Sequence, residues 1–370
     1  MSLVTIRSVV YTGEASPLVK VVETTTELPT PGPGELLVKV QAAAFNPTDY
    51  KHFYAKWGSA GTTVGSDLAG TVVSVGSETS GFKEGDTVAS FLHGGYDPLK
   101  NSGAFQDYVV VPAITTLNLP GLTQQTNVDN IDPSFNIDTF EKAASLPLGL
   151  YTVGMSLENN FGKPKKDSWI LVWGGTTATG YLAIQIAKKI YGAKVITTAN
   201  KAKYESYLKA VGADVVIDYH DDKVIDQLKA ATADNIEYAL DTVSNKDTFN
   251  KTYAALRPTG KSYIDNLLSL GEETLEGQTT KKDTEFSKTF VYLVTGESLD
   301  LNGFKLESSP EIVANHKNFH EKILKAVKDG EIKTMPIKIY PNGFNSADAA
   351  LKELLDGVSF KKLVIRSIDN

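Results

Sequence analysis

The 370-residue sequence contains no cysteine, which excludes disulfide bonds, thiolate metal ligands and thiol nucleophiles. It also lacks any run approaching the roughly 18 apolar residues of a membrane span, so we expect no transmembrane helix and no membrane partner. The first ten residues lack the long apolar core and cleavage site of a secretory signal. These absences favour a cytoplasmic protein, and a nuclear location stays open.

The sequence has no dense cluster of Lys and Arg, and its net charge is −7. The nearest basic run, Lys163, Lys165 and Lys166, is interrupted by Pro164 and Asp167, which favours a solvated loop. A phosphate backbone requires a concentrated basic surface, so we expect no nucleic-acid partner. Hydrophobic residues make up 41% and charged residues 22%, a composition typical of globular proteins, and the length predicts two domains.

The two halves of the sequence differ in their apolar pattern. Up to about residue 115, short alternating segments such as 36–40 and 70–75 are separated by Gly and Pro, which predicts a β-rich domain. After Pro147, apolar runs alternate with helical stretches such as 181–191, which predicts a parallel sheet covered on both faces. The expected parallel strands are 169–173, 195–198, 215–217 and 238–240. Short strands near 330–340 and a strand at 363–365, after a helix at 348–355, are expected to rejoin the first domain.

Three further stretches admit two interpretations. Residues 123–139 and 270–288 are polar and without periodicity, so each is expected to be a long loop, with a lid as the alternative. The apolar run 290–294 is expected to be a strand. It either pairs across a two-fold axis, which would make the protein a homodimer, or lies buried inside one subunit.

A Gly- and Thr-rich turn follows the apolar strand 169–173 and opens a helix. Its residues are Gly174, Gly175, Thr176, Thr177, Ala178, Thr179 and Gly180. Such a turn leaves backbone N–H groups free to bind a pyrophosphate, aided by the helix dipole. The turn departs from G-x-G-x-x-G, but its side chains are small and threonine hydroxyls can donate to phosphate oxygens. We predict a dinucleotide site, with a tight turn that binds no ligand as the alternative.

The residues after the next strand bear on the choice between NAD and NADP. A carboxylate there would bind the ribose 2′-OH and repel a 2′-phosphate. This sequence instead has Thr198, Asn200, Lys201 and Lys203. The lysines are predicted to bind the 2′-phosphate of NADPH, unless both simply begin a surface helix, and Tyr219 is expected to lie against the adenine.

Ligands lie beyond the carboxyl ends of parallel strands. The residues at the ends of the later strands, Asp241, Asn266 and Leu267, are therefore expected to border the cofactor. Helix capping explains Asp241 equally well.

The whole chain resembles the medium-chain dehydrogenase/reductase superfamily, in particular its zinc-independent quinone-reductase and fungal enoyl-reductase branch. The matching segments are 46–51 (NPTDYK), 65–70 (GSDLAG), 81–88 (GFKEGDTV), 103–112 (GAFQDYVVVP) and 143–149 (AASLPLG). The resemblance implies an α/β protein with the active site in its cleft. Residues 1–148 and 309–370 would form a GroES-like β-rich catalytic domain, and residues 149–308 an inserted Rossmann domain with a doubly wound parallel sheet.

The zinc-dependent members of the superfamily hold their metal with a cysteine and a Gly-His-Glu segment. Here that segment reads Gly65-Ser66-Asp67, and serine does not replace imidazole in the usual tetrahedral ligand set. His316 and His320 have an i, i+4 spacing, but no third ligand is evident, so we expect a solvated helix face there. No metal is expected.

Without zinc, the charge that develops on a carbonyl oxygen must be met by other donors or cations. By the resemblance, Lys51 lines the nicotinamide end of the cleft, where it binds either a cofactor ribose or an oxyanion, and Thr152 orients the nicotinamide. Tyr50, His52, Tyr54 and His93 are candidate proton donors, with solvent water as the alternative.

These residues predict hydride transfer from NADPH to a small aldehyde, α,β-unsaturated carbonyl or quinone. One alternative is a trans-acting enoyl reductase for carrier-bound intermediates. The other is a non-catalytic NADPH-binding sensor or structural protein.

Overall fold

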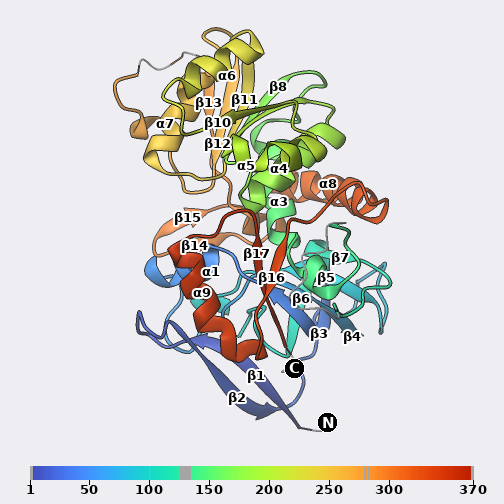
Figure 1. Ribbon diagram of the computed structural model, residues 1–370. Helices are drawn as coiled ribbons and strands as arrows, with labels where there is room; N and C mark the ends of the chain where they lie inside the picture. The colour runs from blue at the N-terminus through green and yellow to red at the C-terminus, as the bar shows by residue number, and fades with distance from the viewer. Residues whose placement is uncertain (1–2, 100, 126–134, 279–280, 282, 368–370) are drawn as a thin grey trace. The chain divides into compact units, whose positions relative to one another are not determined.

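The computed structural model describes residues 3–99, 101–125, 135–278, 281 and 283–367. The chain divides into two compact units (Figure 1). The first unit comprises the described residues of Met1–Leu148, Tyr292–Ser309 and Thr334–Asn370. The second comprises those of Gly149–Val291 and Pro310–Lys333. Segments from the beginning and the end of the sequence therefore fold together in the first unit.

These units differ from the expected domains over residues 292–333. The expectation assigned 309–370 to the first domain and 149–308 to the second, whereas 292–309 pack with the first unit and 310–333 with the second. Helix α8 (Pro310–Lys328) accounts for part of this difference. Lys322 Nζ of α8 donates to the buried Glu158 at 2.9 Å, and Glu158 lies in a π-helical turn, Ser156–Asn160, of the second unit.

The first unit is built mainly from antiparallel strands. Its main sheet has the order β16-β17-β3-β4-β5-β7, with β6 paired to β3. The strands of the unit are β1 (Val4–Tyr11), β2 (Val19–Thr26), β3 (Glu35–Ala44), β4 (Asp67–Val75), β5 (Thr87–Phe91), β6 (Tyr108–Pro112), β7 (Thr116–Asn118), β14 (Leu299–Leu301), β15 (Phe304–Leu306), β16 (Ile337–Ile339) and β17 (Lys362–Arg366). The predicted return of the C-terminal strand is confirmed, because β17 pairs with β3 through Val364 and Ala44.

Among the described residues, three α-helices lie wholly in the first unit and one crosses its boundary. The three are α1 (Thr48–Tyr54), α2 (Phe140–Ala144) and α9 (Ala347–Asp356), and α3 (Pro147–Met155) runs from the first unit into the second. The inward faces of the strands and α9 bury a core that includes Val38, Leu68, Phe105 and Leu351. Burial of this apolar surface holds strand β3, between β17 and β4, in a fixed position.

The second unit contains the predicted parallel sheet, in the order β10-β9-β8-β11-β12-β13. Its elements are β8 (Trp169–Trp173), α4 (Ala178–Lys189), β9 (Lys194–Ala199), α5 (Lys201–Ala210), β10 (Val215–Asp218), α6 (Val224–Thr232), β11 (Ile236–Asp241), α7 (Lys246–Ala255), β12 (Ser262–Asn266) and β13 (Thr284–Phe286). The chain runs outward from β8 to β10 and then crosses to β11 on the other side of β8. This is the doubly wound order, whose ligands bind at the point where the strand order reverses.

Two secondary-structure predictions are wrong. The run 290–294 is not a strand, because Val291–Thr295 forms a 3₁₀ helix whose Tyr292 packs on His93 in the first unit. A short apolar run does not reveal by itself whether it is strand or helix. The homodimer contact was predicted from a strand at 290–294, and the structure has a 3₁₀ helix at Val291–Thr295 instead.

The stretch 270–288 is also not one long loop, since β13 lies within it and pairs in parallel with β12. Of the loop predicted at 123–139, residues 126–134 lie outside the described residues.

The predicted solvated position of His316 and His320 is wrong as well. His316 is 3% exposed and its ring packs on Tyr151, while His320 Nδ1 is 2.7 Å from the Tyr151 hydroxyl. His316, Phe319 and Ile323 recur at the spacing of one buried helix face, so both imidazoles belong to the packed side of α8.

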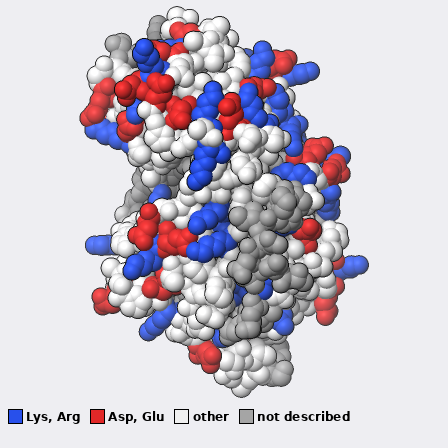
Figure 2. Space-filling view, viewed as in Figure 1, with Lys and Arg blue, Asp and Glu red and all other residues white. Residues whose placement is uncertain are grey.

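Within the described ranges, no helix is both long and apolar enough to cross a membrane. On the face drawn in Figure 2, Lys and Arg side chains are interspersed with Asp and Glu. This mixture is consistent with the absence of a concentrated basic segment in the sequence.

Candidate functional site

The turn between β8 and α4 is shaped by its glycines. Gly174 has φ +87°, a backbone conformation that residues other than glycine rarely adopt. A Cβ on Gly180 would lie 2.2 Å from the Gly174 carbonyl oxygen, and one on Gly175 would lie 2.3 Å from the Thr197 hydroxyl. The turn thus requires glycine for backbone conformation at its start and for close packing at its start and end.

Two threonine hydroxyls form hydrogen bonds within the protein that stabilise the turn. The Thr177 hydroxyl caps α4 by accepting from the Gly180 N–H at 2.9 Å, and it donates to Thr242 Oγ1 at 2.9 Å. The Thr198 hydroxyl accepts from the Gly174 N–H at 3.0 Å. These hydroxyls therefore fix the backbone, and Thr176 and Thr179 are the threonines left to meet a ligand.

Three backbone N–H groups of the turn have no acceptor among the described residues. They belong to Thr176, Ala178 and Thr179, the last two in the first turn of α4. The first N–H groups of a helix lack partners within the helix and point outward from its positive end. The geometry is therefore that of an anion-binding turn, and it fits the pyrophosphate of a dinucleotide.

The predicted basic residues follow β9 at the start of α5. Asn200 caps α5 by accepting from the Lys203 N–H at 3.2 Å. Lys201 and Lys203 are exposed; the ammonium of Lys201 is 3.9 Å from Glu205, and that of Lys203 lies 5.1 Å from the Tyr204 ring centroid. Exposed pairs of this kind stabilise little, so both cations are available to a phosphate.

A carboxylate that sequence reasoning did not assign, Asp218 at the end of β10, neighbours these lysines. Asp218 accepts from the N–H groups of His220 at 2.9 Å and Lys201 at 3.1 Å, and its carboxylate is 2.8 Å from the His220 imidazole Nδ1. The His220 N–H bond leads the contacts that hold the pKa of Asp218 below its usual range. The predicted adenine neighbour, Tyr219, is exposed, and its ring is 4.0 Å from that of His220.

The polar side chains predicted at the ends of β11 and β12 accept hydrogen bonds from the protein's own backbone N–H groups. The carboxylate of Asp241 accepts from Val243 N–H at 3.0 Å, Ser244 N–H at 2.9 Å and Thr248 Oγ1 at 2.7 Å. The side-chain oxygen of Asn266 accepts from the N–H groups of Leu268 and Leu270. Both side chains therefore hold the loop that follows their strand, and the N-cap of α7 is Asn245 rather than Asp241.

Apolar side chains at the same strand ends are exposed. Val243 follows β11 and is 41% exposed, and Leu268 follows β12 and is 44% exposed. The predicted Leu267 is half-buried, and its N–H donates to the Ser244 hydroxyl at 2.8 Å. Exposed apolar side chains beside an anion-binding turn fit the ribose and ring faces of a dinucleotide. An apolar residue just after a strand end is the sequence signal that would have found them.

The predicted residues near the substrate lie in both units. Thr152 is half-buried on the part of α3 that belongs to the second unit, whereas Tyr50 and Lys51 are half-buried on α1 in the first. Burial lowers the pKa of Lys51, and its ammonium makes no ion pair with any described residue. Tyr54 is 52% exposed and is therefore less suited than its neighbours to a water-excluded site.

His93 lies in an aromatic stack of the first unit. Its ring is 3.8 Å from Tyr292 on one face and 4.2 Å from Tyr96 on the other, both nearly parallel, and 5.1 Å edge-on from His52. Although His93 is only 7% exposed, neither ring nitrogen has a hydrogen-bond partner in the described structure. Burial lowers the pKa of His93 well below its usual value, so the imidazole is neutral and presents one donor and one acceptor.

A buried polar cluster surrounds the first turn of α1. Asp67 accepts from the Leu148 N–H at 2.7 Å, the Asn46 side chain at 2.8 Å and Lys362 Nζ at 3.4 Å. Asp49 accepts from the Asn46 N–H at 2.7 Å and the Ser66 hydroxyl at 3.3 Å. From the sequence, Asp49, Ser66 and Asp67 stood out only as parts of segments that resemble the family. Lys362 was not identified as a candidate residue.

These groups do not form a zinc site. The chain has no cysteine, Ser66 stands where the zinc-dependent relatives have a histidine, and the two carboxylates are committed to the donors just described. In the described part of the chain, no three His, Asp or Glu side chains converge in a metal-binding arrangement. The donor set lacks the N and S ligands of a tetrahedral zinc site, so no step is assigned to a metal.

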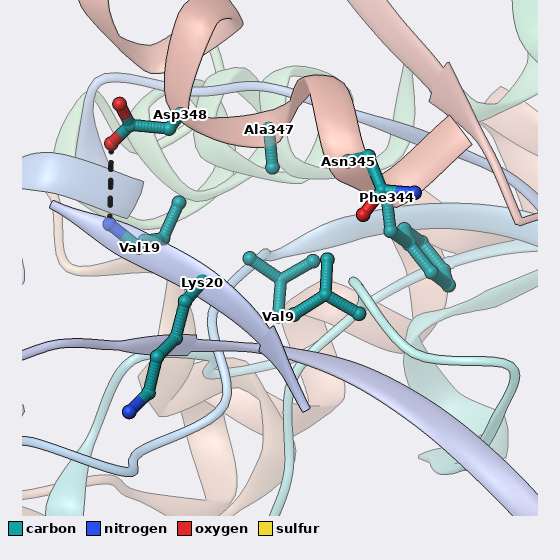
Figure 3. Close-up of a pocket in the computed structure, with 8 residues that line it drawn as sticks. Val9, Val19, Lys20, Phe344, Asn345, Ala347 and Asp348 are labelled. Carbon is teal, nitrogen blue, oxygen red and sulfur yellow. Dashed lines mark hydrogen bonds between the residues drawn. The ribbon is translucent and has the colours of Figure 1, made fainter. Parts of the chain in front are cut away.

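A separate small cavity lies between the start of β2 and helix α9 of the first unit (Figure 3). Val9, Val19, Phe344 and Ala347 line it, and the Asp348 carboxylate closes one side by accepting from the Val19 N–H at 3.3 Å. Its volume is about 90 Å³. The cavity is too small for a cofactor or substrate and is not the candidate site.

Comparison with known proteins agrees with this architecture. A family model described as "Alcohol dehydrogenase GroES-like domain" matches residues 32–121, and one described as "Zinc-binding dehydrogenase" matches residues 178–296. Protein YNL134C of Saccharomyces cerevisiae is 33% identical over 335 residues, 88% of each chain. Trans-enoyl reductase caaB of Aspergillus niger is 30% identical over 329 residues, 84% of each chain.

Solved structures share the fold at lower identity. The CurK enoyl reductase superposes with a TM-score of 0.72 at 18% identity, covering 98% of this chain and 99% of the other. The quinone oxidoreductase of Pseudomonas syringae gives 0.70 at 21% identity, with 97% and 99% covered. The chain belongs to the medium-chain dehydrogenase/reductase family of oxidoreductases, whose members commonly bind NAD(P). The predicted fold class, a GroES-like domain with a Rossmann domain, is confirmed.

Proposed function

We propose that the protein is a reductase that transfers hydride from NADPH to a small aldehyde, α,β-unsaturated carbonyl or quinone without zinc. The observation that carries this proposal is the turn at 174–180, with its close-packed glycines and its three N–H groups that lack an acceptor. A strand-to-helix turn that bound no anion would leave those donors at the positive end of α4 with water alone.

The second unit holds the dinucleotide in this proposal. Backbone N–H groups of Thr176, Ala178 and Thr179 bind the pyrophosphate, and Lys201 with Lys203 binds the 2′-phosphate. Val243, Leu268 and Tyr219 supply apolar surface, and Thr152 fixes the orientation of the nicotinamide. When bound, the cofactor supplies the hydride.

The first unit positions the acceptor. The neutral imidazole of His93 donates a hydrogen bond to the acceptor oxygen, which relieves an unpaired buried donor that costs about 1–3 kcal/mol. The flat faces of Tyr96 and Tyr292 keep that imidazole in one plane. Lys51, with a pKa lowered by burial, supplies positive charge either to a cofactor ribose or to the developing oxyanion. Tyr50, packed against the core beside Lys51, is the weaker candidate for proton donation.

Two alternatives to this function are kept, and the first has a specific observation in its favour. The similarity to the trans-enoyl reductase caaB favours carrier-bound thioesters as acceptors rather than free small molecules. A non-catalytic NADPH-binding protein would keep the second-unit turn but not use His93 or Lys51. We propose no nucleic-acid partner and a cytoplasmic location; the oligomeric state stays a prediction.

A turnover screen separates these functions. NADPH oxidation is followed with a panel of aldehydes, enones and quinones, and in parallel with an enoyl thioester on a pantetheine arm. We expect turnover with at least one free acceptor; turnover of the thioester alone supports the trans-acting reductase. Tight NADPH binding without any turnover contradicts the reductase function.

A lysine pair tests the assignment of Lys51. The Lys51→Ala variant is expected to lower kcat/KM by about tenfold, the loss of one charged contact in the transition state. Lys56→Ala, an exposed lysine just after the same helix, is the matched control and is expected to behave like the wild type. Equal values for the two variants would remove Lys51 from the active site.

A further inference from the structure

The second unit buries three carboxyl groups among its described residues, and only one of them has a counter-charge. Glu158 is 2% exposed, and the Lys322 ammonium donates to it at 2.9 Å. Asp241 and Asp265 are both 0% exposed, and neither forms an ion pair with any described residue. Removing a charge from water without a partner costs free energy, so these two side chains require a physical explanation.

Hydrogen bonds, rather than cations, hold both side chains in the charged form. One oxygen of Asp265 accepts from the Asn266 N–H at 2.8 Å. The other accepts from the Asn160 side chain at 2.9 Å and from the Thr289 hydroxyl at 2.6 Å. Asp241 also accepts at both oxygens, from two backbone N–H groups and a threonine hydroxyl. Amide N–H groups only donate, and donors at a carboxyl group favour its ionised form.

Burial acts against these hydrogen bonds. It raises the pKa of Asp265, and the Thr289 hydroxyl is among the donors that oppose this effect. Burial also raises the pKa of Asp241, and the Ser244 N–H leads the contacts that oppose it. Each carboxylate is therefore less stable than it would be in water, and a positive charge brought close to it would stabilise it.

The two carboxylates lie at one edge of the sheet, on its opposite faces. Asp241 and Asn266 end β11 and β12 and are partners in the parallel ladder. Asp265 precedes Asn266 by one residue, so its side chain points to the face opposite that of Asp241. Asp241 meets Thr248 of α7 on one face. Asp265 meets Asn160 of the π-helical turn on the other.

The strand order places the nicotinamide half of a bound dinucleotide at this edge. The pyrophosphate-binding turn follows β8, and the lysines assigned to the 2′-phosphate follow β9, on one side of β8. The other half of the dinucleotide then extends to the opposite side, over the ends of β11 and β12. The exposed Val243 and Leu268 follow these two strands.

The sheet edge thus carries opposite charges at its two ends. Lys201 and Lys203 are positive beyond β9, and Asp241 and Asp265 are negative at β11 and β12. Lys246, which follows β11, is exposed and pairs with a glutamate at the surface. Water and salt screen exposed charges more strongly than buried ones, so the two carboxylates act on a ligand at this end more strongly than Lys246.

We propose that Asp241 and Asp265 stabilise the positively charged nicotinamide of NADP⁺ relative to the neutral ring of NADPH, which favours hydride donation by the bound cofactor. This role rests on the proposed cofactor site but on no particular acceptor. A fixed negative charge acts on the oxidised ring, which carries a positive charge that the reduced ring lacks. The two electrons and the hydrogen leave NADPH together as hydride, and the carboxylates gain and lose neither electrons nor protons.

Binding measurements on the full protein test this role without any acceptor. Calorimetry gives the dissociation constants of NADP⁺, of NADPH and of 2′-phospho-ADP-ribose, which lacks the nicotinamide. The wild type is expected to bind NADP⁺ more tightly than NADPH, and the reverse order overturns the proposal. In Asp265→Asn the ratio of the NADP⁺ constant to the NADPH constant should rise about tenfold, which is about 30 mV for a two-electron couple. The affinity for 2′-phospho-ADP-ribose should stay unchanged.

A carboxylate at the opposite edge of the same sheet is the matched control. Asp214 lies just before β10, at the amino ends of the strands, and pairs with Lys188 at 2.7 Å. Asp214→Asn is expected to keep the wild-type ratio. A wild-type ratio in Asp265→Asn overturns the proposal. An equal loss of all three ligands in that variant assigns Asp265 a structural role and overturns the proposal as well.

Asp241→Asn repeats the test on the other face of the sheet. It should shift the ratio in the same direction, and the double variant should shift it by about 100-fold because the two side chains have no shared partner. If the wild type binds none of the three ligands, the proposed cofactor site fails and this role fails with it. If the cofactor binds but no acceptor is reduced, the reductase function fails, and the affinity ratios still decide the role of the carboxylates.

Discussion

Each unit has its own group of candidate residues, and the two groups are built by different means. In the second unit the anion-binding turn consists of consecutive residues and presents backbone N–H groups. In the first unit the polar cluster takes side chains from α1, β4, the 3₁₀ helix at 291–295 and β17, more than 200 residues apart in sequence, and buries three ionisable groups. A binding turn formed by consecutive backbone N–H groups can be predicted from local sequence. A cluster of side chains that are distant in sequence can be recognised only once the fold is known.

The difference extends to electrostatics. Lys201 and Lys203 are exposed, so water and salt screen their charges. The two carboxyls of the polar cluster, Asp49 and Asp67, are buried, and burial raises the pKa of both. Substitutions in the polar cluster of the first unit should therefore change the free energy of unfolding and its pH dependence. Substitutions at the turn and lysines of the second unit should change the affinity for the ligand.

The largest effect is expected for Asp49→Asn. The folded-state pKa of about 7 lies above the ordinary value of 3.8, so the wild type loses stability as pH rises between these values, by about 1.4 kcal/mol per pH unit. The stability of the variant relative to the wild type should accordingly rise by about 4 kcal/mol from pH 4 to above pH 7.

Denaturant unfolding at several pH values checks this prediction. Carboxyls other than Asp49 titrate in both proteins and cancel in the difference. Parallel stability curves for variant and wild type would contradict a raised Asp49 pKa.

The next effect tests the backbone site of the second unit. A methyl group on Gly180 would lie 2.2 Å from the Gly174 carbonyl oxygen, so Gly180→Ala must displace the turn. We expect NADPH affinity to fall about 100-fold, or roughly 2.7 kcal/mol, in a fluorescence or calorimetric titration. Gly81→Ala, at a turn of the first unit with open space around it, is the control for glycine replacement. Similar affinity in both variants would argue against binding at this turn.

The smallest effect concerns cofactor preference. Lys201→Glu combined with Lys203→Glu is expected to weaken NADPH at least tenfold more than NADH, because only NADPH carries the 2′-phosphate. Asp218→Asn is the complementary change, since it removes the neighbouring carboxylate and should favour NADPH further. Equal losses of both cofactors in the double lysine variant would count against the assigned phosphate site.

Particular residues show where prediction from sequence succeeded. Strand β8 was predicted residue for residue at 169–173, because an uninterrupted apolar run before a glycine-rich turn has few other interpretations. The C-terminal strand and its return to the first unit also followed from pattern. Lys51 and His93 were named from sequence, but the stacking and missing partners of His93 come only from the structure.

The positions of other residues could not have been predicted from the sequence. Tyr292 lies in an apolar run that favours a strand, and only the folded structure places its ring on His93 and its hydroxyl 3.0 Å from Thr48 Oγ1. Lys362 reaches Asp67 across 295 residues, a contact with no local signal. His316 and His320 were misjudged because polarity outweighed their spacing on a buried helix face.

Hydride transfer itself is the central claim, and isotope labelling tests it most directly. The enzyme is supplied with NADPH deuterated at either face of the nicotinamide C4 and with an aldehyde or enone acceptor from the screen, and the product is analysed by mass spectrometry. The account predicts that one of the two labelled cofactors places a single deuterium on the product carbon. Product that lacks deuterium with both labelled cofactors would contradict it.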